Sequence, residues 1–264
     1  MATVTSCDGT TLTYDRTGSG PALIQVDGAL CHRAFGPSGP LAEQLKTEFT
    51  VFRYDRRGRG GSENTLPYSP DREIEDLQAV LAEAGGSAFV YGVSSGAGLA
   101  LEAAKNLSGI TKLVVYEPPF IVDDSRAPVP EDYPERVATA VESGRRGEAV
   151  KLFMKSTGAP GFFVAIMPLV APWSKLKAVA HTIPYDLEIM ASHQHGHPLP
   201  AEEFGKVSIP TLAVVGGKSP HWMQQSVRAV ASVVPEARFE VLPGQNHMVK
   251  PGPLAPVLTG FFKE

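Results

Sequence analysis

The stretch from Ala88 to Ala104 constrains the fold of this chain more than any other. It reads AFVYGVSSGAGLALEAA, which joins a β-favouring apolar run, a serine framed by glycines and an alanine-rich helical face without a break. A GxSxG pattern is informative only when it follows a strand and opens a helix. The segment Gly92–Gly96 meets both conditions, so the sequence predicts a strand, a sharp turn and a helix with Ser94 at the apex.

Such a turn forces its central residue to positive φ and brings the strand and helix backbones close together. Gly92 and Gly96 remove the Cβ atoms that would clash, and the serine hydroxyl then lies at a helix N-terminus, which favours negative charge. Ser95 cannot take this role, because Val93 and Ala97 stand where its framing glycines would be. The simpler alternative is that Ser94 only caps the helix.

Composition indicates one globular unit. The chain has 264 residues, 43% of them hydrophobic and 20% charged, enough to bury a large core as an α/β domain. The net charge of -4 argues against a nucleic-acid partner. With only Cys7 and Cys31, and no basic, apolar leader at the N-terminus, we expect a cytoplasmic protein. The longest apolar run, 161–173, is broken by Pro168 and Pro172, so we expect no membrane partner.

Strands and helices alternate on both sides of a long helical segment. The runs 2–6 and 11–17 flank an Asp-Gly pair and predict a hairpin. Further strands are expected at 22–26, 50–54, 89–91, 113–116, 211–215 and 238–242. Further helices are expected at 41–45, 70–85, 222–234 and from 253 onward. We expect Ser69 to cap the helix that begins at residue 70. This alternation predicts a mostly parallel sheet.

Residues 120–205 interrupt the alternation without a convincing strand. Helical stretches are expected at 131–143, 147–156, 173–182 and 185–192. An all-helical insertion between two strands of an α/β sheet is typical of a lid over the carboxyl ends of the strands. We therefore divide the chain into a first core part (1–119), a helical lid (120–205) and a second core part (206–264).

Four features together resemble the alpha/beta hydrolase superfamily over nearly the whole chain. They are Ser94 in GVSSG, the loop DRRGRGGS from Asp55, the helical interruption, and a histidine between the last strand and the last helix. The resemblance implies an eight-stranded, mostly parallel sheet flanked by helices, with a helical lid inserted after strand six. The superfamily includes esterases, lipases, thioesterases, carbon–carbon bond hydrolases, lactonases and cofactor-free haloperoxidases, so the fold alone does not select a reaction. The loop's three arginines suggest an anion site, but we interpret them as loop scaffolding and solvated charge.

A serine hydroxyl needs a base to remove its proton, and histidine suits this task near neutral pH. Among the seven histidines, only His247 lies in the loop after the last strand, where the resemblance places the base. His193, His195 and His197 form HQHGH, which suggests a metal site. Because no cysteine and no defined carboxylate accompanies them, we interpret the segment as a polar loop.

The oxyanion formed during acyl transfer needs two backbone N–H donors. The resemblance implies the amides of Ser95 and of Ala29, in the loop after the third strand. Many superfamily members have a histidine before the glycine of this loop, whereas this chain has Asp27 before Gly28. A carboxylate in the oxyanion hole would oppose the developing charge, so we expect Asp27 to turn away and hold the loop through backbone hydrogen bonds.

The third member of the triad departs from the usual pattern. Superfamily acids usually follow strand seven, but Ser219 stands there in this chain. Glu117 ends the preceding strand, beside the strand of the nucleophile, and we predict that it reaches His247. The alternatives are that Glu117 pairs with an arginine or caps a turn, or that Asp123 or Asp124 is the acid.

We expect a serine hydrolase that acts on a small or medium apolar ester, thioester, lactone or related acyl substrate. It would use Ser94, His247 and Glu117, and need no cofactor or metal. The expected partner is a small-molecule substrate; the oligomeric state stays open. The second hypothesis is a non-hydrolytic ligand-binding or lyase-type protein with a degraded triad, favoured by Ser219.

Apolar lid residues would line a pocket or pack within the lid: Phe153, Phe162, Phe163, Ile166, Met167, Leu169 and Trp173.

Overall fold

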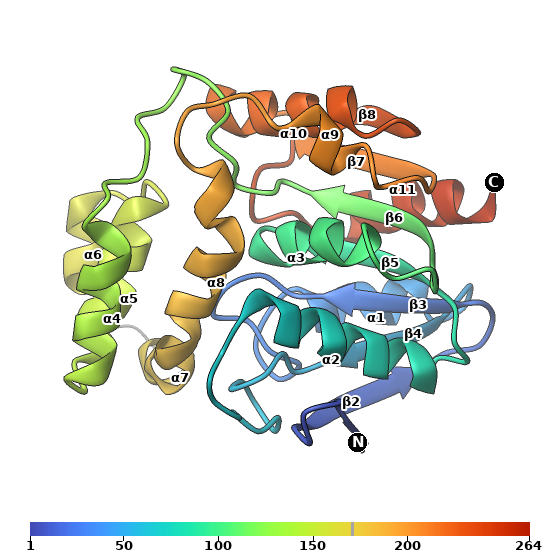
Figure 1. Cartoon of the computed structure of the whole chain (residues 1–264), viewed down its shortest axis with the longest axis horizontal. Coiled ribbons are helices and arrows are strands. Elements are labelled where there is room, and N and C mark those ends of the chain that lie inside the picture. Colours follow the sequence, from blue (N-terminus) through green and yellow to red (C-terminus); the bar gives the residue numbers. More distant parts are fainter. Residues whose placement is uncertain (170–171) are drawn as a thin grey trace.

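The computed structural model describes residues 1–169 and 172–264, with an eight-stranded sheet at the centre (Figure 1). Its spatial order is β1-β2-β4-β3-β5-β6-β7-β8. The pairs β1–β2 and β2–β4 are antiparallel, and every other pair is parallel, as predicted. The strands are β1 (Ala2–Thr5), β2 (Thr11–Thr17), β3 (Ala22–Val26), β4 (Thr50–Tyr54), β5 (Ala88–Val93), β6 (Ile110–Tyr116), β7 (Thr211–Gly216) and β8 (Ala237–Leu242).

Helices cover both faces of the sheet, because the central strands are apolar on both sides. On one face lie α2 (Pro70–Glu83), α3 (Ser95–Ala104) and α10 (His221–Val233), and on the other α1 (Ser38–Leu45) and α11 (Pro251–Lys263) (Figure 1). Each layer encloses its own cluster of buried apolar side chains. Ser69 occupies the N-cap position of α2 but makes no side-chain capping hydrogen bond, contrary to the expectation from sequence.

The insertion between β6 and β7 is helical, and it lies beyond the carboxyl ends of the parallel strands (Figure 1). Its α-helices are α4 (Tyr133–Glu142), α5 (Arg146–Ser156), α6 (Gly161–Ile166), α7 (Trp173–Val179), α8 (Ile183–Met190) and α9 (Ala201–Phe204), with short 3-10 turns at Met167–Leu169, Ala180–Thr182 and Ala191–His193. The sequence did not predict α6, whose glycine, two phenylalanines and β-branched valine are weak helix formers. These helices have a third apolar cluster of their own, into which Leu30 of the core also packs.

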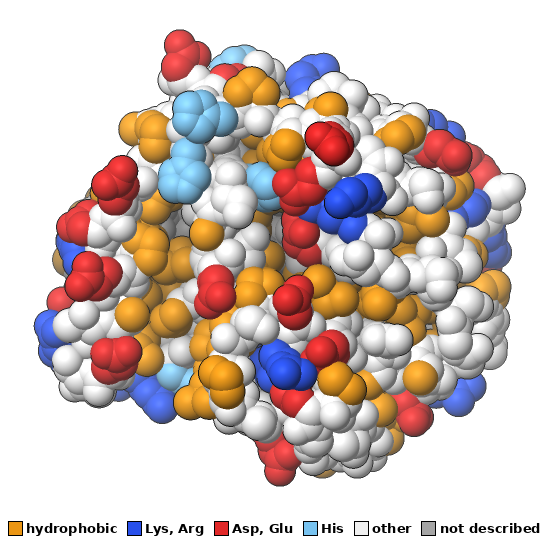
Figure 2. All heavy atoms as spheres, in the orientation of Figure 1, with side chains coloured by type: hydrophobic (Ala, Val, Ile, Leu, Met, Phe, Trp, Pro, Cys, Tyr) orange, Lys and Arg blue, Asp and Glu red, His pale blue; other side chains and the backbone are white. Residues whose placement is uncertain are grey.

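The lid exposes apolar side chains among charged ones (Figure 2). Phe162 and Leu169 are 74% and 86% exposed, and Phe163 and Ile166 are also exposed. Met167 is buried and helps form the lid's own core, so these apolar residues do not act together as the lining of one enclosed pocket.

Within the described residues, no single helix is long and apolar enough to cross a bilayer. The segments Gly161–Leu169 and Trp173–His193 reach that length and composition only as a pair, bent by 98°. Residues 170–171 of the apolar run considered in the sequence lie outside the described residues.

Candidate active site

Ser94 occupies the apex of the turn between β5 and α3, with φ 57° and ψ -129°. A Cβ on Gly92 would lie 2.5 Å from the carbonyl oxygen of Gly96, and one on Gly96 would lie 2.3 Å from that of Val26. Both distances are far shorter than real Cβ contacts, so only glycine fits at either position. A Cβ on Gly28 would meet the Cβ of Ser94 at 2.9 Å, which places the loop after β3 directly against the serine.

Three residues other than glycine have positive φ among the described residues: Leu30, Ser94 and Glu117, at 61°, 57° and 50°. They follow β3, β5 and β6, which are neighbours in the sheet. Such conformations cost free energy and persist where the surrounding structure holds them, most often at functional sites. The strained positions therefore mark one region, at the carboxyl ends of the three central strands.

The carboxylate of Glu117 joins the end of β6 to the loop that follows β8. Its Oε2 lies 2.8 Å from Nδ1 of His247, and Glu117 is fully buried whereas the side chain of His247 is 40% exposed. The hydroxyl of the neighbouring Tyr116 donates to the carbonyl of Asn246 at 2.7 Å. Two successive residues at the end of β6 thus hold this loop, and the structure brings Glu117 and His247 together.

Ser219 stands where the resemblance implies a catalytic acid, but in the structure it hydrogen-bonds to Glu117. Its hydroxyl donates to Oε1 of Glu117, and the backbone N–H of Gly216 donates to the same oxygen at 2.7 Å. Burying a carboxylate is costly unless its oxygens are hydrogen-bonded, and here both oxygens of Glu117 have partners. Asp123, the alternative acid, instead accepts hydrogen bonds from the backbone and hydroxyl of Ser125.

Asp27 turns away from the site, but through a side-chain contact rather than the backbone contacts expected. Its Oδ2 accepts a hydrogen bond from the hydroxyl of Ser38 at 2.8 Å. Burial raises the pKa of Asp27 to about 6, although the Ser38 hydrogen bond and the charges of Arg59, Arg53 and Arg56 act in the opposite direction. The loop that Asp27 begins carries the amide of Ala29. Within the described residues, neither this amide nor that of Ser95 donates to a protein atom.

The arginines of the DRRGRGGS loop are scaffolding, as expected, but they are not solvated. Arg56, Arg57 and Arg59 are each 1% exposed. Arg56 forms two hydrogen bonds to Glu73, at 2.6 and 2.7 Å, and Arg57 forms two to Asp76, both at 2.7 Å. Each guanidinium is thus neutralised by a buried carboxylate, which removes the charge that an anion site would need.

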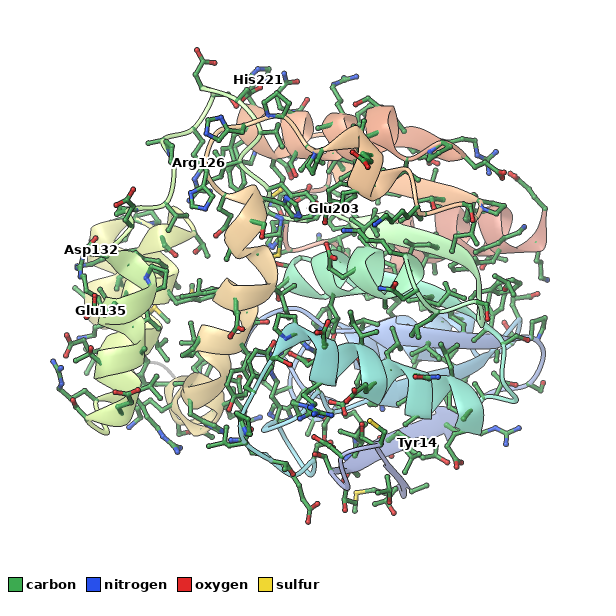
Figure 3. All side chains as sticks on the ribbon, in the orientation of Figure 1. Tyr14, Arg126, Asp132, Glu135, Glu203 and His221 are labelled. Atoms are coloured by element: carbon green, nitrogen blue, oxygen red, sulfur yellow. The ribbon has the colours of Figure 1, made fainter. Side chains whose placement is uncertain are left out.

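The first histidine of HQHGH is part of the core rather than of a polar loop. His193 is buried, and its ring lies 5.0 Å from that of Phe120. Its Nε2 lies 3.8 Å from Glu102 and 3.9 Å from Glu203, a residue that Figure 3 labels on α9. The structure thus brings two carboxylates beside this histidine, which the sequence did not predict. The ammonium of Lys105 forms ion pairs with both and offsets one of their two negative charges.

The glycine-framed serine, the histidine–carboxylate pair and the amides of Ala29 and Ser95 all follow strands of the parallel part of the sheet at their carboxyl ends. Within the described residues the Ser94 hydroxyl makes no hydrogen bond to His247, so the structure joins the histidine to Glu117 but not to the serine. The sequence profile described as "Alpha/beta hydrolase family" matches residues 10–255. The chain belongs to the alpha/beta hydrolase family. Within it, an alpha/beta hydrolase from Sphaerobacter thermophilus is 48% identical over 99% of this chain and 100% of its own, with a TM-score of 0.92.

Two solved structures of lower identity share the alpha/beta hydrolase fold. A thermophilic esterase from Thermogutta terrifontis has a TM-score of 0.71 and 20% identity, over 99% of this chain and 97% of its own. An enol-lactonase from Burkholderia xenovorans has a TM-score of 0.74 and 18% identity, over 99% of this chain and 100% of its own. These two structures show the shared fold, and membership of the family supports hydrolase activity for the chain.

Sequence reasoning missed one residue of this alpha/beta hydrolase site. Asp186, on lid helix α8, is buried and accepts hydrogen bonds from Arg56, Arg59 and Ser95. Nothing in the local sequence IPYDLEIM distinguishes this aspartate from a surface residue of an amphipathic helix. The available signal was the cluster of three arginines in one short loop, because guanidinium groups that become buried require carboxylate partners. Arg56 and Arg59 of that loop are the two that pair with Asp186.

Proposed function

We propose that this alpha/beta hydrolase is a serine hydrolase acting on a small or medium apolar ester, thioester, lactone or related acyl substrate. Ser94 is the nucleophile, His247 the base and Glu117 the acid that orients it. The observation that carries the proposal is the 2.8 Å contact between Glu117 and His247, because it supplies the carboxylate that Ser219 cannot.

The chemistry follows from the geometry of the pair. When Nδ1 of His247 donates to Glu117, Nε2 is left with a lone pair to accept the proton of the Ser94 hydroxyl. The serine oxygen attacks the acyl carbonyl, and the imidazolium gives its proton to the leaving group as the acyl-enzyme forms. Water, deprotonated by the same histidine, then releases the acid and restores the serine. The amides of Ala29 and Ser95 stabilise the oxyanion in both steps.

The class of substrate rests on less specific support than the mechanism. The exposed lid residues Phe162 and Leu169 offer apolar surface beyond the carboxyl ends of the strands, where ligands of open α/β sheets bind. The structural neighbours that are an esterase and an enol-lactonase indicate acyl substrates of this kind. The degraded-triad alternative is weakened, because the Ser219 hydroxyl supports Glu117 rather than replacing it.

A fluorophosphonate probe combined with p-nitrophenyl esters of increasing chain length tests the proposal. The wild type should be labelled and should show a chain-length optimum, whereas Ser94→Ala should lose both properties while remaining folded. His247→Ala should match Ser94→Ala, with a loss of about a million-fold or somewhat less in kcat, and the double variant should be no worse than either alone. Hydrolysis that persists in Ser94→Ala, in enzyme free of wild-type contamination, would exclude Ser94 as the nucleophile.

A further inference from the structure

We propose that Asp186 of the lid is a positioning residue that sets the geometry of the oxyanion hole. The inference rests on the proposed acyl-transfer function and adds to it a part played by the lid. We therefore treat α8 as a rigid part of the active site that stays packed against the core, and not as a mobile lid helix.

Asp186 contacts the nucleophile turn directly. Its Oδ1 accepts a hydrogen bond from the hydroxyl of Ser95 at 2.7 Å. Ser95 is the first residue of α3 and carries one of the two proposed donor amides. Because the hydroxyl and the amide belong to the same residue, the side-chain bond restricts the direction in which the amide points.

The same carboxylate reaches the second donor through two arginines. Arg59 Nη2 donates to Oδ2 of Asp186 at 2.7 Å, and Arg59 Nη1 donates to the carbonyl of Gly28 at 2.8 Å. Arg56 Nη1 bonds both to Oδ1 of Asp186, at 2.8 Å, and to the carbonyl of Asp27, at 3.2 Å. Asp186 therefore fixes the two guanidinium groups that donate hydrogen bonds to the carbonyls of Asp27 and Gly28.

The hydrogen bond from Arg59 to the Gly28 carbonyl determines the direction of the Ala29 amide. The Gly28 carbonyl and the Ala29 N–H belong to one planar, trans peptide group, in which they point in opposite directions. Fixing the carbonyl on Arg59 therefore turns the N–H to the opposite side of the peptide. The hydrogen bond from Arg59 to the Gly28 carbonyl thus sets the orientation of the Ala29 amide on the opposite side of the loop.

The charges within the network balance. Burial acts to raise the pKa of Asp186, but the charges of Arg59 and Arg56 and hydrogen bonds from Arg59 and Ser95 outweigh it, so the pKa is lowered. Asp186 is therefore ionised at neutral pH, and with Glu73 it balances the two guanidinium groups. A neutral aspartic acid would lose one acceptor and leave Arg59 without its carboxylate partner.

Helix α8 has further contacts that hold it against the core. A Cβ on Gly98 of α3 would lie 2.7 Å from the sulfur of Met190, so the two helices pack at close range. Tyr185 stacks on Tyr68 with ring centroids 3.8 Å apart. Thr182, just before α8, accepts from Nε of Arg59 at 3.1 Å. These contacts indicate that α8 moves with the core.

The test compares two variants with a matched control. Ser95→Ala removes one hydroxyl and keeps the donor amide, and Asp186→Asn keeps the shape and removes the charge. The control is Asp76→Asn, which alters an equally buried aspartate–arginine pair of the same loop that has no hydrogen bond to the oxyanion-hole residues. Should Asp186→Asn fail to fold, Ser95→Ala still tests the contact.

We expect kcat on a p-nitrophenyl ester to fall about ten-fold in Ser95→Ala and about hundred-fold in Asp186→Asn, with KM nearly unchanged. Losing an oxyanion-hole donor outright costs about hundred- to thousand-fold, so a misplaced donor should cost somewhat less. The inhibition constant of phenylboronic acid, whose tetrahedral adduct with Ser94 places an oxygen in the hole, should rise by similar factors. Asp76→Asn should change neither value.

Wild-type kcat and boronate affinity in folded Ser95→Ala and Asp186→Asn would overturn the inference. A second readout separates it from the proposed function. The amide NMR signals of residues 28–30 and 95 should shift or broaden in Asp186→Asn and stay in place in Asp76→Asn. If the wild type neither reacts with fluorophosphonate nor hydrolyses esters, the proposed function fails, and unchanged amide signals would then also refute the positioning role.

Discussion

Glu117 Oε2 lies 2.8 Å from Nδ1 of His247, although the two residues are 130 positions apart in the chain. The carboxylate sits at the end of β6, while the serine that follows β7 supplies one of its hydrogen bonds. The carboxylate that contacts His247 thus follows β6, whereas the superfamily resemblance places the acid after β7. Ser219, at the usual position of the acid, donates a hydrogen bond to this carboxylate.

Glu117→Gln should lower kcat by about hundred-fold or more with little change in KM, because the imidazolium that forms in the transition state loses its counter-charge. Ser219→Ala should cost about ten-fold, since Gly216 still donates to the same oxygen. Ser219→Asp should be more harmful than Ser219→Ala, because two carboxylates would face each other in a buried site. A higher kcat in Ser219→Asp, with Glu117→Gln unchanged, would move the acid to the position after β7.

Asp27→Asn should stabilise the protein at neutral pH. The folded-state pKa of Asp27, about 6, lies above the unaltered value of 3.8, so between these values the folded state binds more protons than the unfolded state. The free energy of unfolding therefore falls as pH rises through this window, by up to about 3 kcal/mol. Urea unfolding should show Asp27→Asn more stable than the wild type at pH 7.5 and equal to it near pH 4.

Asp8→Asn is the control of opposite sign. Hydrogen bonds from Thr10 and the nearby Arg57 outweigh the effect of burial and lower the pKa of Asp8 to about 2. The stability that this carboxylate contributes is present above pH 3.8 and is lost as pH falls toward 2. Asp8→Asn should therefore destabilise the protein at pH 7.5. Parallel pH dependence of the two variants would contradict both assignments.

Gly96→Ala and Gly260→Ala should have opposite effects on stability. A Cβ on Gly96 would lie 2.3 Å from the carbonyl oxygen of Val26 and 2.6 Å from that of Asp27, both backbone atoms that cannot move aside cheaply. We expect the free energy of unfolding to fall by about 2 kcal/mol or more. Gly260 lies in helix α11 with nothing within 4 Å of a Cβ, so alanine should stabilise it by about 0.5–1 kcal/mol. Equal stability of the two variants in urea would contradict this packing.

The exposed apolar side chains of the lid should affect substrate preference more than stability. Phe162→Ser combined with Leu169→Ser removes two side chains that are 74% and 86% exposed, so the free energy of unfolding should change by no more than about 0.5 kcal/mol per site. Because the proposed function places these side chains on the apolar substrate surface, kcat/KM for an octanoate ester should fall about ten-fold relative to acetate in the double variant. Val241→Thr, at an exposed apolar position on β8, should leave that ratio unchanged.

Local sequence determined the elements that depend on neighbouring residues. The turn at Ser94 follows from the two glycines, which are needed wherever a strand passes into a helix so tightly. The order of strands and helices follows from hydrophobic periodicity, and it located His247 in the loop after the last strand. Sequence periodicity failed at α6, whose composition is poor for a helix and which forms through packing within the lid.

The sequence predicted that Glu117 reaches His247, a contact that the structure confirms, but it left Asp123 and Asp124 open as alternatives. Tertiary structure decided between them and made the other long-range contacts of the site. That Glu117, and not Asp123, contacts His247 depends on the order β6-β7-β8 in the sheet and on the backbone strain at Glu117. The bond between Ser95 and Asp186, 91 residues apart, depends on where the lid packs. Hydrophobic periodicity predicts which face of an element is buried, but it does not predict which buried carboxylate pairs with which arginine. That choice is made only when distant segments come within hydrogen-bonding distance.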